Sequence, residues 1–273
     1  MLAECRRMKG VLIRALATVA PPLVFLLLVL VAWDRLVVWG DIPAFRLPRP
    51  LAVLEAGWQR RAALGSATWN TAVSALGGFG LSLAVGTLLA LVFSQFPLVR
   101  RAVYPYAIFF QTVPIVAVAP LVIRWVSYEP LKVMIVAHFI SVFPIITNVT
   151  AGMTRIDANQ RELFAIHNAT WRQMLFKLRL PNAVPYLVIG ARISCGLAVI
   201  GAIVGDIYAG SGASADAYAL GYFIHQTGGQ LKTAEQFAGV LCSTFLGLAI
   251  FGAVSLSGTT VLWRWHGAHA REQ

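Results

Sequence analysis

The sequence predicts an all-α integral membrane protein with six transmembrane helices, and composition and hydropathy lead to this class. Of its 273 residues, 58% are hydrophobic and only 12% are charged, whereas soluble domains carry about 25% charged residues. The mean hydropathy is +0.73. The uncharged runs are long enough to cross a bilayer and leave no room for a soluble domain of ordinary size.

Six runs of low charge define the expected spans, because a helix rises about 1.5 Å per residue across roughly 30 Å of hydrocarbon. They form a transmembrane domain over 15–264, between an N-terminal segment, 1–14, and a tail, 265–273. The spans are placed at about 15–33, 69–94, 102–126, 132–154, 183–206 and 236–263. The first run lacks a small-x-small cleavage site, so we expect it to be retained.

The loop charges predict that both termini face the cytoplasm. In that orientation 13 Lys and Arg residues lie inside and 8 outside, while Arg192 lies within a span. Basic residues accumulate in cytoplasmic loops of membrane proteins. The net charge of +11 therefore reflects topology, and we expect lipid and protein partners but no nucleic acid.

Proline and charge within the spans mark candidate pathway positions. Pro114 and Pro120 lie in the third run, where proline breaks backbone hydrogen bonds and indicates either a broken pathway helix or a kinked structural one. Arg192 falls near mid-depth of the fifth run and is either a pathway residue or a structural cation. Asp206 lies near the outer end of the same run, about 21 Å away along a helix, so these two side chains cannot pair.

Close helix packing is expected along the second run, where Ser74, Gly78, Ser82 and Gly86 recur at four-residue spacing. Catalytic patterns such as HExxH, CxxC, GxSxG and GxxxxGK[ST] do not occur in the sequence. We therefore expect no catalytic residue, no cofactor, no metal site and no enzymatic activity, and ATP hydrolysis would require a partner.

The loop at 155–182, after the fourth span, is basic and amphipathic. Leu163 and Ile166, and further along Met174 and Leu178, recur at helical spacing. The pattern predicts two short helices divided near residues 168–170. Thr170 can cap the second helix, and Pro181 is expected to end it.

This loop resembles the EAA loop of the inner-membrane permease subunits of binding-protein-dependent ABC importers. Glu162 matches the motif's glutamate, and Leu178, Leu180 and Pro181 match its closing I-x-L-P. The two small residues are replaced by Leu163 and Phe164. Asn168, followed by Ala169, replaces the glycine, and asparagine is the next most tolerant residue for the left-handed conformation. The resemblance implies that Glu162–Asn168 docks on the ATPase.

Other segments are similar to the nitrate, sulfonate and taurine branch of this family, over about residues 40–265. They are Leu47-Pro48-Arg49-Pro50, Val113–Leu121, Pro181–Tyr186, Gly190–Ile193 and Gly210-Ser211-Gly212. Arg124, where an apolar residue is usual, departs from the pattern. The resemblance implies a type I ABC importer permease in a bacterial inner membrane, working as a homodimer with an ATPase dimer and an extracytoplasmic binding protein.

The residues favour one class of substrate and one mechanism over their alternatives. The branch handles small anions and heterocyclic vitamin precursors, and Arg161–Phe164 with Ile207–Gly212 look most like its riboflavin and pyrimidine importers. An ATP-independent channel or secondary transporter is the alternative, but it predicts acidic residues within the spans for ion coupling. A membrane enzyme would need convergent His, Asp or Glu residues there.

Overall fold

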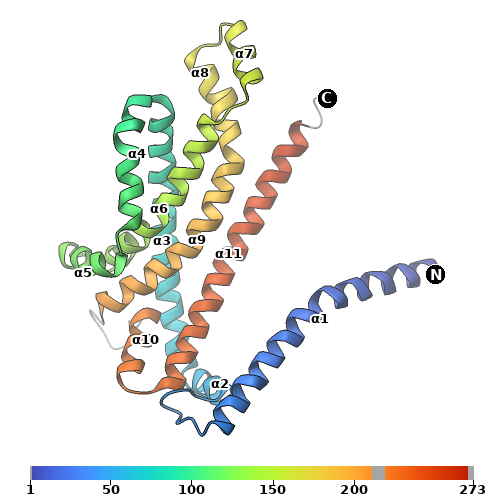
Figure 1. Ribbon diagram of the computed structural model, residues 1–273, viewed down its shortest axis with the longest axis vertical. Coiled ribbons are helices and arrows are strands. Elements are labelled where there is room, and N and C mark those ends of the chain that lie inside the picture. Colours follow the sequence, from blue (N-terminus) through green and yellow to red (C-terminus); the bar gives the residue numbers. More distant parts are fainter. Residues whose placement is uncertain (1, 211–218, 270–273) are drawn as a thin grey trace. The chain divides into compact units, whose positions relative to one another are not determined.

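The computed structural model describes residues 2–210 and 219–269, which form helices joined by turns and contain no strand (Figure 1). Ser211 and Gly212 of the last resembling segment, and residues 270–273 of the predicted tail, lie outside the described residues. The elements are α1 (Leu2–Trp39), α2 (Pro50–Gln59), α3 (Arg61–Gln95), α4 (Pro97–Thr112), α5 (Ile115–Trp125), α6 (Glu129–Thr154), α7 (Ala158–Ile166), α8 (Trp171–Met174), η1 (Leu175–Arg179), α9 (Leu180–Ala209), α10 (Leu220–Gly229) and α11 (Thr233–His269).

Five of these helical stretches are long and apolar enough to cross a membrane, and α4 with α5 makes a sixth if the bent pair counts as one span. The helices extend beyond several predicted spans. α1 continues past residue 33 to Trp39, and α11 continues past residue 264 to His269. Charged residues at both places remain helical because a helix continues into the interfacial region without needing apolar side chains.

The third predicted span, 102–126, is not one continuous helix. α4 ends at Thr112, α5 begins at Ile115, and their axes differ by 102°. Pro114 has no N–H, and a proline keeps the residue before it extended; Val113 accordingly has φ −68° and ψ 123°. Pro105 and Pro120 remain inside α4 and α5, so position 114 alone makes the corner.

The described chain divides into two compact units, the first comprising residues 2–60 and 227–238. Side chains join its segments. Arg49 forms an ion pair with Asp34 at 2.8 Å, and this hydrogen bond raises the pKa of Arg49. Arg60 pairs with Glu235 at 3.1 Å. The short helix α2 belongs to this unit.

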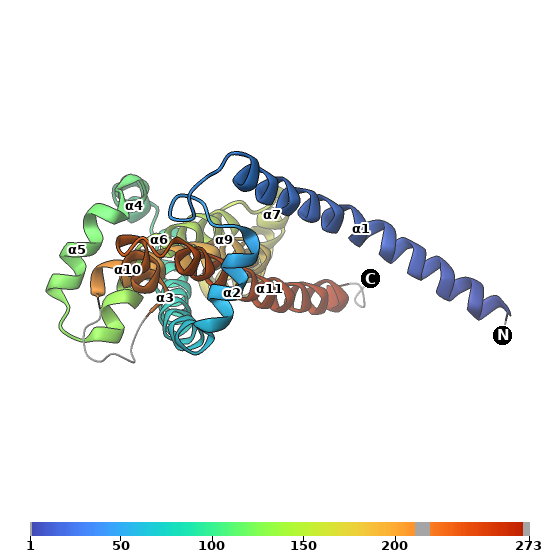
Figure 2. The same cartoon turned by 90° about the horizontal axis from the view of Figure 1, so that it is seen from below.

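The second unit is built on α3, α6 and α9, which contact one another directly (Figure 2). The four-residue pattern of small residues on α3 predicted this approach, and the structure confirms it at Gly78, Ser82 and Gly86. A Cβ added at Gly78 would lie 2.6 Å from the Cβ of Ala137, and one at Gly86 would lie 2.8 Å from Ile145. Only glycine allows these backbones so close.

A buried polar group lies in the same seam between α3 and α6. The hydroxyl of Ser82 is 2.8 Å from Nδ1 of His138 and 2.8 Å from the hydroxyl of Ser141, which donates to the carbonyl of Ala137. Buried polar groups need such partners away from water. His138 is therefore a packing residue whose polar ring has a hydrogen-bond partner.

Candidate functional site

The loop between α6 and α9, residues 155–182, carries most of the predicted site residues and extends from one end of the α3–α6–α9 bundle (Figure 1). Glu162 and Leu163 are exposed on α7, and Phe164 is half-buried. Here the chain forms α7, a turn at residues 167–170, and then α8 and η1. The loop is thus an ordered structure made of short helices.

Asn168 forms the turn that ends α7. Its φ is +48°, in the left-handed region. The N–H of Asn168 donates to the carbonyl of Ala165 at 3.0 Å, and the N–H of Ala169 donates to that of Phe164 at 3.0 Å. This is the Schellman pair of hydrogen bonds, which usually requires glycine at this position. Asparagine thus performs the backbone role that the resemblance assigns to glycine.

Thr170 caps α8, as the sequence predicts. Its backbone N–H donates to Oε1 of Gln173 at 2.7 Å, and its hydroxyl accepts from the Gln173 N–H, which makes a capping box. Two consecutive caps leave few backbone groups without partners between α7 and α8. The angle between the two helices is therefore held by hydrogen bonds.

Three side chains fasten this loop to the bundle. The indole N–H of Trp171 donates to Oε1 of Gln95 at 2.6 Å, and the guanidinium of Arg179 donates to the carbonyl of Ser94. The amide of Asn182 donates to the carbonyls of Gly152 at 2.6 Å and Arg155 at 3.2 Å, where α6 ends. These three anchors give no signal in the sequence, because their hydrogen-bond partners lie far away along the chain.

Pro181 does not end a helix, which corrects the sequence prediction. Residues Leu175–Arg179 form one π-helical turn that runs directly into α9, and Pro181 lies in the first turn of α9. Proline has no N–H to donate, and just before it the Leu180 N–H bonds to the carbonyl of Leu175, five residues back, as in a π-turn. Leu178 is buried, and Leu180 packs half-buried against the cluster of Ala90, Ile145 and Val149. These residues connect the loop to the core.

The outer surface of the loop combines apolar and basic side chains. Leu163 is 54% exposed, Ile166 76%, Trp171 60% and Phe176 65%. Arg161, Arg172 and Lys177 are exposed among them. Aromatic, aliphatic and arginine side chains at an exposed helix surface are typical of protein interfaces. The surface has the chemistry needed to bind a protein partner.

Asp206 and Arg192 do not meet, as predicted from their separation on α9. Oδ2 of the buried Asp206 accepts from the hydroxyl of Thr71 on α3 at 2.7 Å and from the N–H of Gly221 at 3.4 Å. Thr71 also accepts the N–H of Leu220 at 2.9 Å. Asp206 and Thr71 thus cap the start of α10. Thr71 was missed because its partners, Asp206 and Leu220, lie far away along the chain.

Arg192 lies between α9 and α11. One of its terminal nitrogens donates to the carbonyl of Ser255 at 3.3 Å. Its Nε is buried without a hydrogen-bond partner, as are the hydroxyls of Ser255 and of Ser194 on α9. The guanidinium is therefore partly satisfied by backbone, which is a common solution for a cation within a span.

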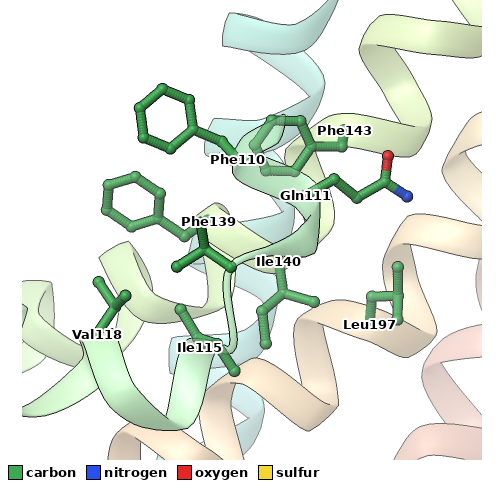
Figure 3. A pocket seen from close by; sticks show the side chains of 9 residues that line it. Phe110, Gln111, Ile115, Val118, Phe139, Ile140, Phe143 and Leu197 are labelled. Carbon is green, nitrogen blue, oxygen red and sulfur yellow. The ribbon is translucent and has the colours of Figure 1, made fainter. Parts of the chain in front are cut away.

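Pro114 forms the corner between α4 and α5 and Pro120 lies within α5. The corner borders a cavity of about 440 Å³ in the second unit. The cavity is lined by Phe110, Gln111, Val113, Ile115, Val118, Phe139, Ile140, Phe143 and Leu197 (Figure 3). These residues come from α4, α5, α6 and α9 and from the link between α4 and α5. None of the lining residues is marked individually in the sequence, because they are scattered apolar residues with one glutamine.

Comparison with known proteins decides the family. The model of the binding-protein-dependent transport system inner membrane component family matches residues 82–267, which include the loop, Arg192 and Asp206. The chain belongs to this family. It is a permease subunit of an ABC importer, a multi-pass inner-membrane protein that works with an ATPase and a substrate-binding protein, and it is not itself an enzyme.

The similarity to several transport permeases extends over most of the chain. The formylaminopyrimidine transport permease ThiX of Halalkalibacterium halodurans is 31% identical and covers 89% of this chain and 95% of its own. The riboflavin transport permease RibX of Chloroflexus aurantiacus is 31% identical, covering 90% of each chain. The putative aliphatic sulfonates permease SsuC of Bacillus subtilis is 26% identical, covering 86% of this chain and 84% of its own.

One similar solved structure is a chain of the inward-facing MetNI methionine ABC transporter. It has a TM-score of 0.47 and 21% sequence identity, and the match covers 72% of this chain and 96% of that chain. The helical content, the five or six apolar spans and the family match together establish a type I permease fold.

Proposed function

We propose that this permease imports a neutral, planar heterocycle of the riboflavin or pyrimidine class, driven by an ATPase that docks on α7 and the turn after it. The observation that carries the docking site is the structure of the α6–α9 loop. Its turn at Asn168 is closed by two hydrogen bonds of 3.0 Å, and its base is tied to α3 and α6. A rigid element transmits a displacement that a flexible loop would absorb.

The docking surface comprises Glu162, Leu163, Phe164, Asn168 and Ala169, and Leu178, Leu180 and Pro181 connect it to the bundle. Exposed Leu163 supplies an apolar contact, and exposed Glu162 supplies a carboxylate to a groove on the partner. The proposed sequence is that closure of the ATPase moves α7, and that the loop's anchors pass the movement to α3, α6 and α9.

Two relatives support the substrate class. ThiX and RibX, both 31% identical, have names that specify a formylaminopyrimidine and riboflavin. SsuC, whose name specifies aliphatic sulfonates, is 26% identical, and a bicarbonate permease, CmpB, is 27% identical over 55% of this chain. Both heterocycles are planar, hydrogen-bonding molecules, and an aromatic-lined site suits such molecules.

The assembly that this function requires is a homodimer of the chain, with an ATPase dimer and a binding protein. Six spans in one copy leave the pathway to be completed by a second copy. In this arrangement, segment 1–14, loop 155–182 and tail 265–273 all lie on the cytoplasmic side, because their excess of Lys and Arg favours that side. Domain 15–264 spans the inner membrane.

Reconstitution of the permease with its ATPase and binding protein tests the docking site. Glu162→Ala removes the carboxylate, and Asn168→Pro removes an N–H donor and excludes the left-handed turn. We expect import to fall at least tenfold while ATP hydrolysis continues and membrane insertion is unchanged. Glu55→Ala on α2, another exposed glutamate on a short helix, is the matched control. Unchanged import in both loop variants would refute the docking assignment.

A further inference from the structure

The cavity at the α4–α5 corner has the size and position of a ligand site. Its volume of about 440 Å³ lies within the roughly 300–1,000 Å³ that small-molecule pockets occupy. It opens where a span is broken, and discontinuous spans form substrate sites in membrane transporters. This inference rests on the proposed function, because it concerns the substrate class named there.

The lining of the cavity selects against charge. Three phenylalanine rings, Phe110, Phe139 and Phe143, and the amide of Gln111 stand among aliphatic side chains. None of the nine lining residues is charged. An anion in such surroundings would lose its hydration without gaining a cation, which costs several kcal/mol or more. Nitrate, bicarbonate and sulfonates therefore do not fit this site.

The same lining suits a flat, polarisable ring with hydrogen-bonding edges. In the view of Figure 3 the rings of Phe110 and Phe139 lie on one side and the amide of Gln111 on the other. Stacking of a nucleobase-like ring on an aromatic side chain contributes about 1–3 kcal/mol. The Gln111 amide offers both a donor and an acceptor, which matches the amide-like edge of a pyrimidine or flavin ring.

The backbone groups at the break are paired with each other. The Val113 N–H donates to the Phe110 carbonyl at 3.3 Å, and the Ala117 N–H donates to that of Pro114 at 3.0 Å. The polar side chain that the lining offers to a ligand is therefore the amide of Gln111.

We propose that this cavity is a subsite that receives a neutral planar heterocycle during import, stacked on Phe110, Phe139 and Phe143 and hydrogen-bonded by Gln111. A side chain of a second copy, or a lipid chain, would occupy the cavity differently. Either would fill it without any need for Gln111, and neither would be displaced by a heterocycle.

Protection of an introduced cysteine tests occupancy directly. Val118→Cys, at a lining position that neither stacks on nor hydrogen-bonds the ligand, is made in the complete complex after Cys5, Cys195 and Cys242 are changed to alanine. We expect riboflavin or a formylaminopyrimidine to slow maleimide labelling at least fivefold, whereas nitrate has no effect. Val116→Cys, an exposed position of α5 outside the lining, is the control and should be unaffected. Absence of protection, or a disulfide between two copies at position 118, would overturn the proposal.

Transport kinetics separate this inference from the proposed function. Phe139→Leu should raise the half-saturating riboflavin concentration about tenfold, Phe139→Trp should restore it, and Phe245→Leu on α11 should leave it unchanged. If riboflavin import is normal in every variant, the subsite is wrong but the function stands. If the wild-type complex imports taurine or nitrate instead of both heterocycles, the substrate class fails and the subsite with it.

Discussion

The corner between α4 and α5 and the loop between α6 and α9 both interrupt the helices of the second unit, but they are built in opposite ways. In the loop, a Schellman turn, a capping box and three side-chain anchors satisfy the backbone. At the corner, a proline removes a hydrogen bond and aromatic rings border an open cavity. A segment that transmits force needs satisfied bonds, whereas a segment that binds ligand needs open space.

The largest effect is expected from removing the hydrogen bonds that hold the base of the loop to α6. Asn182→Ala removes hydrogen bonds to the carbonyls of Gly152 and Arg155, and two such bonds contribute about 2 kcal/mol. We expect a lower unfolding temperature of the complex and faster hydrogen exchange over residues 155–170. Asn148→Ala is the control, since its amide bonds within its own helix, to Pro144. Equal exchange in both variants would mean that the loop is stiff without this anchor.

A smaller effect is expected from restoring the missing donor at the corner. Pro114→Ala supplies an N–H and removes the ring that excludes a helical Val113, so the bend of 102° between α4 and α5 should become straighter. We expect the free energy of unfolding to fall by about 1 kcal/mol. Spin labels at the exposed positions Tyr106 and Leu121 should then move apart. Pro120→Ala, inside α5, is the control and should not change this distance. An unchanged distance at Pro114→Ala would show that packing, not the proline, maintains the corner.

The smallest effect is expected from giving the loop the residue usual in its motif. Asn168 has φ +48°, and Asn168→Gly removes the steric cost of a side chain in this left-handed conformation. Glycine also has more freedom in the unfolded chain, so the free energy of unfolding should change by about 0.5 kcal/mol in either direction. Import should stay within twofold of wild type. A large loss of import would show that the Asn168 side chain itself contacts the ATPase, which proteoliposome assays would detect.

Several of these features follow from sequence alone. The small-residue spacing on α3 predicts the close approach of α6, because small residues such as glycine and serine allow helix backbones to approach closely. The motif spacing predicts the turn at Asn168, and the threonine after it predicts the cap of α8. The prediction that Pro181 ends a helix is wrong, since a π-helical turn carries the helix past the proline.

Sequence by itself determined that this chain is helical, that it crosses a membrane, and where its basic loop lies, because hydrophobic length and charge are read residue by residue. Tertiary structure decided which proline becomes a corner, which side chains fasten the loop, and how Thr71 and Asp206 meet at the start of α10. It also decided that rings from α4 and α6 line one cavity together with a glutamine. These contacts join residues distant in the chain, so only the folded arrangement of the helices can place them together.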